Sequence, residues 1–302
     1  MNCIQSTAMK TLLTASFALA LAAGLGARQA PATQQPPVPS AAPAAPAADA
    51  PRPIHIYIRA GLKSHGEGLH DYPQFIADWS KLLTEHGAVV DGGLHFPDAH
   101  ELADVDVMVM YKGDAGYMTA SEKAVLEDYV KRGGGVVLFH DTLCGDDPAY
   151  MASIVGGGKK HGEVNFSAGD ISYAVVDKQS PIMKDMGDIT IKDEAFFKMT
   201  WADNPKIHVL ATAAMPDTPG AQGHVGEAVP QIWTYEHTIF GGQPSRAFVW
   251  MQGHTYANFA RPDIQKMILR GIAWTARAPI DTLVNGTAPQ RGGGRRGRSG
   301  GA

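Results

Sequence analysis

Cysteine is scarce in this sequence, with only Cys3 and Cys144 among 302 residues. This excludes a disulfide scaffold and a cysteine-rich zinc or iron–sulfur site. An excess of one charge is also missing, because 26 Lys and Arg stand against 30 Asp and Glu. Hydrophobic residues make up 44% of the chain and charged residues 19%. That composition supplies enough apolar side chains for a globular core and excludes wholesale disorder.

The N-terminal apolar run is short for a membrane span. Thr11 to Ala27 carries no charge and is rich in Leu and Ala, but a spanning helix needs about 20 such residues. Lys10 precedes the run, and small residues suited to cleavage end it. We therefore expect residues 1–27 to be a secretory signal peptide, read from Met1 or Met9, and the protein to be periplasmic or secreted without stable membrane insertion after cleavage.

Two further segments lack the side chains needed for a core. Residues 28–53 are rich in Pro and Ala, which predicts an extended linker, and residues 287–302 form an Arg/Gly tail that we expect to be disordered. The remaining domain, residues 54–286, holds 19 Lys and Arg against 29 Asp and Glu. Its charge of −10 argues against nucleic acid as a partner. The sequence leaves the oligomeric state open.

The domain begins with alternating strand and helix patterns. Apolar or β-branched runs at 54–60, 89–90, 105–111 and 136–139 predict strands, and amphipathic segments at 71–86 and 119–132 predict helices between them. This alternation predicts an α/β fold, a parallel sheet with helices on both faces. Shorter strands near 171–176, 189–191, 207–211, 231–235 and 246–251 follow, and a last helix is expected over 261–276.

Polar residues follow the predicted strands, where ligands bind in open α/β sheets. No HExxH motif is present, and residues 54–286 contain no G-x-S-x-G nucleophile motif.

Histidine is the side chain that recurs at these positions. Imidazoles titrate near neutral pH and ligate metals when neutral. A divalent metal such as zinc, held by some of His70, His140, Glu194 and His254, is therefore one open alternative. The candidate site residues are His65, His70, His140, His161, Glu194 and His254.

The succession of motifs over residues 54–277 resembles the ThuA-like (trehalose-utilisation) family. The motifs include HGEGLHDY at 65–72, GGGVVLFHD at 133–141, Asp193-Glu194, Gly253-His254 and GIAW at 271–274. The resemblance implies a class I glutamine-amidotransferase-like fold, with a flavodoxin-like sheet and extra strands in the C-terminal half. It also implies a link to sugar catabolism. The amidotransferase cysteine is missing, since the strand runs into His140-Asp141. Ser180-Pro181-Ile182 stands where many relatives have His-Pro-Ile.

The leading hypothesis is proton transfer on a small-molecule carbohydrate, such as a keto-glycoside, leading to elimination, hydration or hydrolysis. His140 is the first choice for general base, with Glu194 orienting it or sharing the proton. His65, His70, His161 and His254 would bind substrate, and some of them could hold a metal. A non-catalytic carbohydrate-binding module is the alternative, and it requires exposed aromatic side chains. A third hypothesis, a redox or amidotransferase enzyme built on the Cys144 thiol, requires that thiol to be exposed beside a histidine.

Overall fold

The structure is a computed structural model that describes residues 52–162, 166–203, 206–239 and 241–286. All of them belong to one contact unit, Ala50–Ala302. The predicted signal peptide, the tail and nearly all of the linker lie outside the described residues. No helix in the described ranges is both long and apolar enough to span a bilayer.

The described elements alternate between strands and helices in the first half and are mostly strands in the second. The helices are α1 (Tyr72–Glu85), α2 (Ala120–Lys131), α3 (Pro148–Val155), α4 (Pro262–Thr275) and α5 (Thr282–Asn285). The strands are β1 (His55–Ala60), β2 (Val89–Gly93), β3 (Val107–Tyr111), β4 (Gly135–Phe139), β5 (Cys144–Gly145), β6 (Gly157–Lys160), β7 (Phe166–Val175), β8 (Thr190–Phe196), β9 (Thr200–Trp201), β10 (Ile207–Ala214), β11 (Ala228–His237) and β12 (Ser245–Trp250).

The main sheet has nine strands in the order β2-β1-β3-β4-β12-β11-β10-β7-β8. The first five are parallel to their neighbours, and with β12 as the fifth strand they follow the flavodoxin order 2-1-3-4-5. The other four extend the sheet in antiparallel pairs. A small sheet, β5-β6-β9, stands beside it. The predicted parallel sheet with extra C-terminal strands is therefore confirmed.

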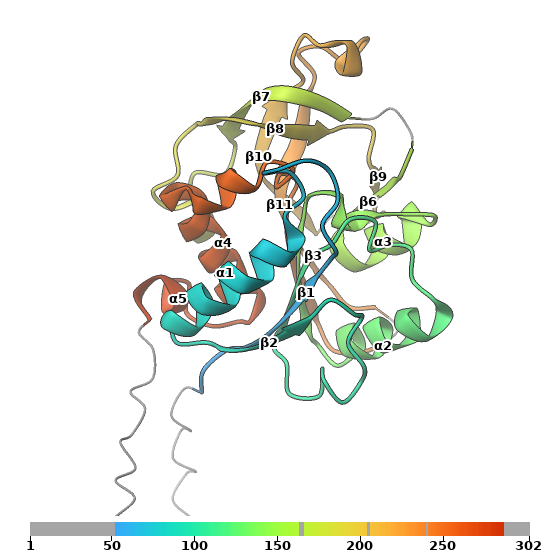
Figure 1. The fold of residues 1–302 in the computed structure, drawn as a ribbon, viewed down its shortest axis with the longest axis vertical. Helices are drawn as coiled ribbons and strands as arrows, with labels where there is room; N and C mark the ends of the chain where they lie inside the picture. The colour runs from blue at the N-terminus through green and yellow to red at the C-terminus, as the bar shows by residue number, and fades with distance from the viewer. Residues whose placement is uncertain (1–51, 163–165, 204–205, 240, 287–302) are drawn as a thin grey trace, which may run out of the picture. The chain divides into compact units, whose positions relative to one another are not determined.

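Helices cover both faces of the parallel part, as the alternation of its side chains requires. Ile56 and Ile58 of β1 belong to the apolar cluster that contains Phe75 of α1 and Ile268 of α4. The side chain between them, Tyr57, belongs to the opposite cluster, which also holds buried residues of α2 and α3. Figure 1 shows α1 and α4 on one side of the sheet and α2 and α3 on the other.

Local signals explain most helix ends. Thr119 and Glu122 form a capping box at the start of α2, with Oγ1 of Thr119 accepting from the Glu122 N–H and Glu122 Oε2 accepting from the Thr119 N–H. Asp71 stands at the N-cap position of α1, but its side chain caps nothing and pairs with Lys63 at 2.5 Å. Helix α3 was not predicted, because eight residues give too little periodicity to recognise.

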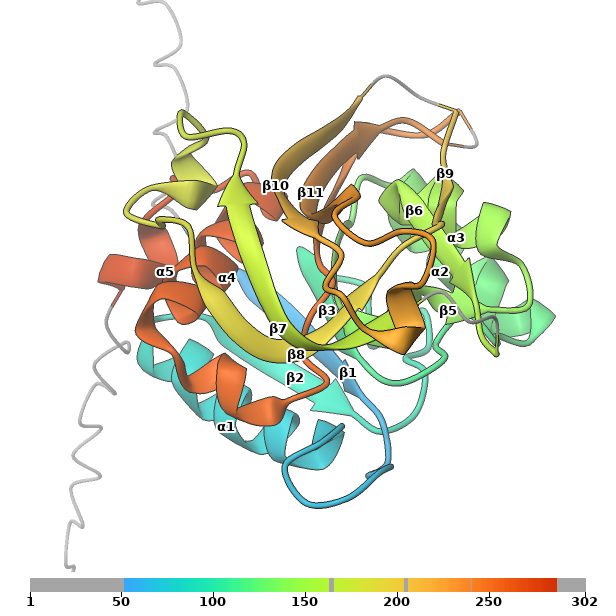
Figure 2. The ribbon, with the colours of Figure 1, turned by 90° about the horizontal axis from the view of Figure 1, so that it is seen from above.

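The carboxyl ends of the parallel strands meet at one edge of the sheet, and β7 and β8 lie across that edge (Figures 1 and 2). Strand β8 is longer than the sequence indicated, so that Glu194 lies within the strand and not after it. The fold thus brings a residue of an antiparallel strand over the ends of β1, β3, β4 and β12.

Candidate functional site

A cavity of about 730 Å³ lies at these strand ends. This volume is typical of small-molecule sites. The structure brings every predicted site residue to its wall: His65, His70, His140, His161, Glu194 and His254. Ser180, where the chain departs from the family motif, lines a different hollow, so the substitution does not touch this cavity.

Strand β4 delivers His140 into the cavity in a fixed orientation. The residue follows the last strand residue, has a positive φ of 54°, and is only 1% exposed. Its Nδ1 lies 3.2 Å from the carbonyl oxygen of Met251. Because a carbonyl can only accept, Nδ1 carries the hydrogen and Nε2 presents a bare lone pair. Such a bond to a carbonyl is the usual partner of a metal-ligating histidine.

Two loops that are tied together supply the other two buried imidazoles. The N–H of His70 donates to the carbonyl of His254 at 3.0 Å, and Leu69 forms an isolated antiparallel bridge with Thr255. His70 Nδ1 lies 3.1 Å from the hydroxyl of Ser64, which leaves its Nε2 for the cavity. The loop after β1 and the loop after β12 therefore position His70 and His254 as one unit.

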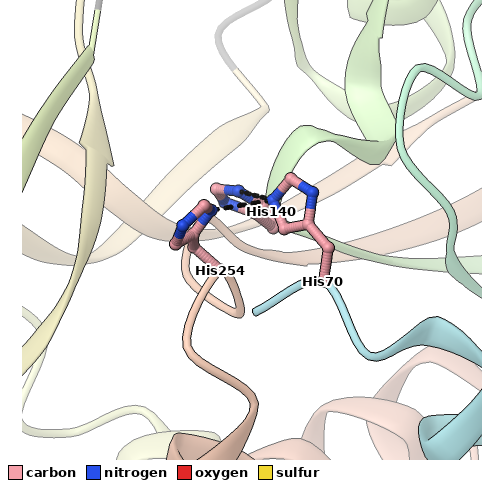
Figure 3. Close-up of side chains that lie close together, drawn as sticks. All are labelled: His70, His140 and His254. Atoms are coloured by element: carbon pink, nitrogen blue, oxygen red, sulfur yellow. Dashed lines mark hydrogen bonds between the residues drawn. The ribbon is translucent and has the colours of Figure 1, made fainter. Parts of the chain in front are cut away.

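The three imidazoles converge on one point, as Figure 3 shows. His70 Nε2 is 2.8 Å from His254 Nδ1 and 3.0 Å from His140 Nε2. One nitrogen atom of each ring lies within 4.8 Å of the other two. His140 Nε2 carries no hydrogen and His70 Nε2 can carry only one, so a linear hydrogen bond can account for only one of these two short contacts.

Glu194 faces this cluster from β8. Its two carboxylate oxygen atoms lie 3.6 Å from His140 Nε2 and 3.6 Å from His254 Nδ1. Burial, with smaller contributions from Asp193 and Asp141, raises the pKa of Glu194 to about 7. The side chain is 15% exposed, so it borders the cavity and is not enclosed in the core.

Burial favours the neutral form of the three imidazoles. It lowers the pKa of His70 to about 3 and that of His254 to about 4, and neighbouring histidines add to both shifts. The pKa of His140 falls well below its ordinary value, first through burial and then through His70 and His254. Neutral imidazole is the form that ligates metals.

Asp193 belongs to the Asp193-Glu194 motif but is not among the site residues predicted from the sequence. Its buried carboxylate accepts from the backbone N–H groups of Gly253, His254 and Thr255 at 3.1–3.4 Å and from the amide of Asn258 at 2.6 Å. It therefore anchors the loop that carries His254. The signal was present in the sequence, since Asp193 takes an inward position of β8 where an apolar residue is expected.

The exposed histidines of the site lie at the cavity wall. His65 has a φ of 66°, and its ring centroid is 4.1 Å from that of His70. His161 pairs with Asp114, Nδ1 to Oδ1, at 2.6 Å. Both side chains can therefore reach a ligand in the cavity, but neither belongs to the convergent cluster.

The donor set fits a divalent metal such as zinc. Zinc–nitrogen bonds of about 2.0–2.1 Å in tetrahedral geometry set ligand nitrogens about 3.3 Å apart. The N–N distances around His70 are 2.8 Å and 3.0 Å, and all three ligand atoms lie within 4.8 Å of one another. His140 has its outer hydrogen bond to a carbonyl, and Glu194 is placed beside the cluster. His70, His140 and His254 are therefore the residues that could hold the cation.

Comparison with known proteins places the chain in a family. The family model for ThuA, described as trehalose utilisation, matches residues 64–275. A protein described as ThuA-like from Bacteroides uniformis has 19% identity and a TM-score of 0.56 over 76% of this chain and 95% of that one, which is a likeness of fold. No curated protein matches the chain.

Two other solved structures are more distant. A cold-adapted β-galactosidase from Rahnella sp. R3 has 14% identity and a TM-score of 0.47, over 76% of this chain and 32% of that one. A protein described as a GMP synthase component from Thermoplasma acidophilum has 14% identity and a TM-score of 0.44, over 76% and 98%. The chain belongs to the ThuA family of trehalose utilisation, which associates it with carbohydrate catabolism.

Proposed function

We propose that this protein is an exported enzyme that carries out acid–base chemistry on a sugar or keto-glycoside. It would hold a divalent cation, zinc in the first instance, on His70, His140 and His254, with Glu194 as the proton carrier. The observation that carries the proposal is the convergence of three imidazole nitrogens, two of them within 3.0 Å of His70 Nε2, beside a carboxylate at 3.6 Å.

The position of each residue in the cavity determines its proposed role. A bound cation would act as a Lewis acid that polarises a carbonyl or hydroxyl of the sugar. Glu194 borders the cavity and would take the proton from the carbon next to the carbonyl. The bond from the neighbouring carbon to the glycosidic oxygen would then break, and Glu194 would return the proton to the oxygen that leaves. His140 is enclosed and turns its free nitrogen to His70. We therefore assign cation binding to His140 and proton transfer to Glu194.

His65 and His161 would bind substrate hydroxyls at the cavity wall. Both are exposed and line the cavity. Asp114 pairs with the imidazole of His161 and so orients it. Imidazoles that offer one donor and one acceptor suit sugar hydroxyls, which do both.

The observed burial does not favour the other two hypotheses. A carbohydrate-binding module needs exposed aromatic rings. Of the six aromatic residues near the late strands, Trp201 and Tyr256 are half-buried, and the other four are at most 3% exposed: Trp233, Tyr235, Trp250 and Phe259. A thiol enzyme needs a reactive cysteine, but Cys144 is 1% exposed, and burial raises its pKa above the ordinary value.

Turnover of paired sugars tests the proposal. The zinc-loaded full chain is incubated with methyl glucosides and with their 3-keto derivatives, and product is measured. We expect turnover of the keto forms alone, because only these carry a carbonyl next to the proton that is removed. Equal turnover of both forms would count against proton abstraction next to a carbonyl.

Glu194→Gln tests the proton carrier, because it keeps the shape of the side chain and removes its basicity. We expect turnover to fall by about 10²–10⁴-fold while the metal content stays that of the wild type. The matched control is Glu227→Gln, at an exposed position outside the cavity. Unchanged turnover in Glu194→Gln would remove Glu194 from this role.

A further inference from the structure

Three cationic side chains line the cavity outside the imidazole cluster. Arg59 lies on β1, Lys112 directly follows β3, and Lys159 lies on β6. Arg59 is 7% exposed and Lys159 is 5% exposed. Cations are seldom so deeply buried without a carboxylate partner, because removing them from water costs several kcal/mol.

Within the described ranges, the hydrogen bonds of these cations go to backbone carbonyls and to no carboxylate. Arg59 also has a buried Nε for which the described residues provide no partner. Burial, followed by the nearby Arg59, lowers the pKa of Lys112. The acceptors are the carbonyls of Ala60 and Leu94 for Arg59, of Gly113 and Asp114 for Lys112, and of Lys160 for Lys159.

The acidic residues of the same wall have partners of their own. Asp114 pairs with His161 at 2.6 Å. Asp141 accepts from the hydroxyl of Tyr72, at 3.0 Å to one oxygen atom and 3.2 Å to the other. Neither carboxylate forms a direct ion pair with Arg59 or Lys112 in the described part of the wall, where Asp114 and Asp141 attract Lys112 only at longer range. The carboxylate that attracts Arg59, Glu122, also acts at longer range.

Sheet register places two of the cations together. Arg59 on β1 lies opposite Met110 on the parallel strand β3, and Lys112 comes two residues after Met110. Arg59 and Lys112 therefore lie at the carboxyl ends of neighbouring strands. Lys159 Nζ is 4.9 Å from the ring centroid of Phe196, and that ring stacks on His140 at 5.0 Å. Lys159 therefore extends toward the imidazole cluster. Arg59 and Lys112 form a separate pair of cations at the ends of β1 and β3.

We propose that the substrate is a sugar with an anionic group, a carboxylate or a phosphate, which binds at Arg59 and Lys112 while the sugar carbons face His70, His140 and His254. This rests on the proposed function of the site and names the class of its substrate. Arg and Lys are the side chains that recognise such anions, and a buried charged hydrogen bond discriminates strongly against a ligand that lacks the charge.

Isothermal titration of the zinc-loaded full chain tests this with four probes: D-glucuronate, D-glucose 6-phosphate, D-glucose and inorganic phosphate. We expect at least one anionic sugar to bind about tenfold or more tightly than D-glucose. The tighter of the two identifies the anionic group. Lys112→Met and Arg59→Met should abolish the preference, whereas the exposed Lys178→Met should keep it.

Three results would overturn the inference: no preference for either anionic sugar, a preference that survives in both Lys112→Met and Arg59→Met, or inorganic phosphate binding as tightly as D-glucose 6-phosphate. If Arg59→Met fails to fold, Lys112→Met alone decides. Zinc content is measured on the same samples. A wild-type chain that shows the preference but holds no zinc contradicts the proposed metal centre only, and a zinc-loaded wild-type chain without the preference contradicts this inference only.

Discussion

His140 can act as a base or as a metal ligand, but its one free nitrogen cannot do both. The Met251 carbonyl holds the hydrogen on Nδ1, so only Nε2 is available, and it points at His70 Nε2 3.0 Å away. The sequence could predict that His140 ends a buried strand. It could not predict which nitrogen is free, because that depends on a carbonyl 111 residues away.

A prediction at the scale of single residues concerns the buried imidazole of His237. Neither of its ring nitrogens has a hydrogen-bond partner among the described residues, and the ring stacks on Tyr235 at 4.2 Å. Burial lowers its pKa from 6.5 to about 4. Between these pH values the unfolded chain binds a proton that the folded chain does not, so stability is full above pH 6.5 and falls toward pH 4.

Replacing His237 by Phe should remove this loss. Relative to the wild type, we expect the free energy of unfolding of His237→Phe to improve by roughly 3 kcal/mol between pH 7 and pH 4. Urea unfolding at both pH values measures it, with the exposed His100→Phe as the matched reference. A difference that does not change with pH would show that His237 is not held neutral.

At the scale of elements, the site depends on strand ends and on the loops that follow them. The sequence located these ends because β3 and β4 are apolar runs that stop at polar residues, and β1 is a strand-like run that stops at Gly61. It did not show that β8 would cross the ends of the parallel strands and bring Glu194 to the cavity. That placement depends on antiparallel pairing with β7, which leaves little trace in local periodicity.

Asp193 is the clearest test of how a loop is held. Replacing it by Asn leaves backbone N–H groups of the loop at 253–255 without a charged acceptor. We expect Asp193→Asn to lose about 1–3 kcal/mol of stability and to bind zinc about 10–100-fold more weakly. Asp170→Asn, at an exposed position of β7, is the control. Zinc affinity equal to that of the wild type would mean that Asp193 does not position His254.

The packing of α4 on β12 explains one glycine of the GIAW motif. A Cβ on Gly271 would overlap the ring of Phe248, which is fully buried on β12. Although alanine is the better helix former, we expect Gly271→Ala to lower the free energy of unfolding by about 1–3 kcal/mol. Gly187→Ala, where a Cβ would meet nothing within 4 Å, is the matched control. Thermal unfolding measures the stability of both variants, and equal stability of the two would contradict this packing.

At the scale of the whole molecule, one sheet edge gathers residues from the entire domain. The cavity combines His70, His140 and His254, which are separated by up to 184 residues, with Glu194 from the antiparallel extension. The rule that ligands bind at the carboxyl ends of parallel strands was enough to choose these positions from the sequence. Which of them converge, and which only line the wall, required the tertiary structure.

A cation bound by residues from three loops should also stabilise the fold, because it binds the folded chain more tightly than the unfolded one. We expect zinc to raise the melting temperature of the wild type and to have little effect on His70→Ala or His254→Ala. His208→Ala, an exposed histidine paired with Asp177 at 2.7 Å, is the control that should respond to zinc as the wild type does.

The central claim is that His70, His140 and His254 form a metal centre, and the metal content of the purified protein tests it most directly. After equilibration with zinc and removal of free metal, we expect about one zinc ion per wild-type chain and a loss of most of it in His70→Ala and in His254→Ala. A wild-type chain without zinc, cobalt, manganese or another divalent metal, or variants that retain the full amount, would contradict the claim.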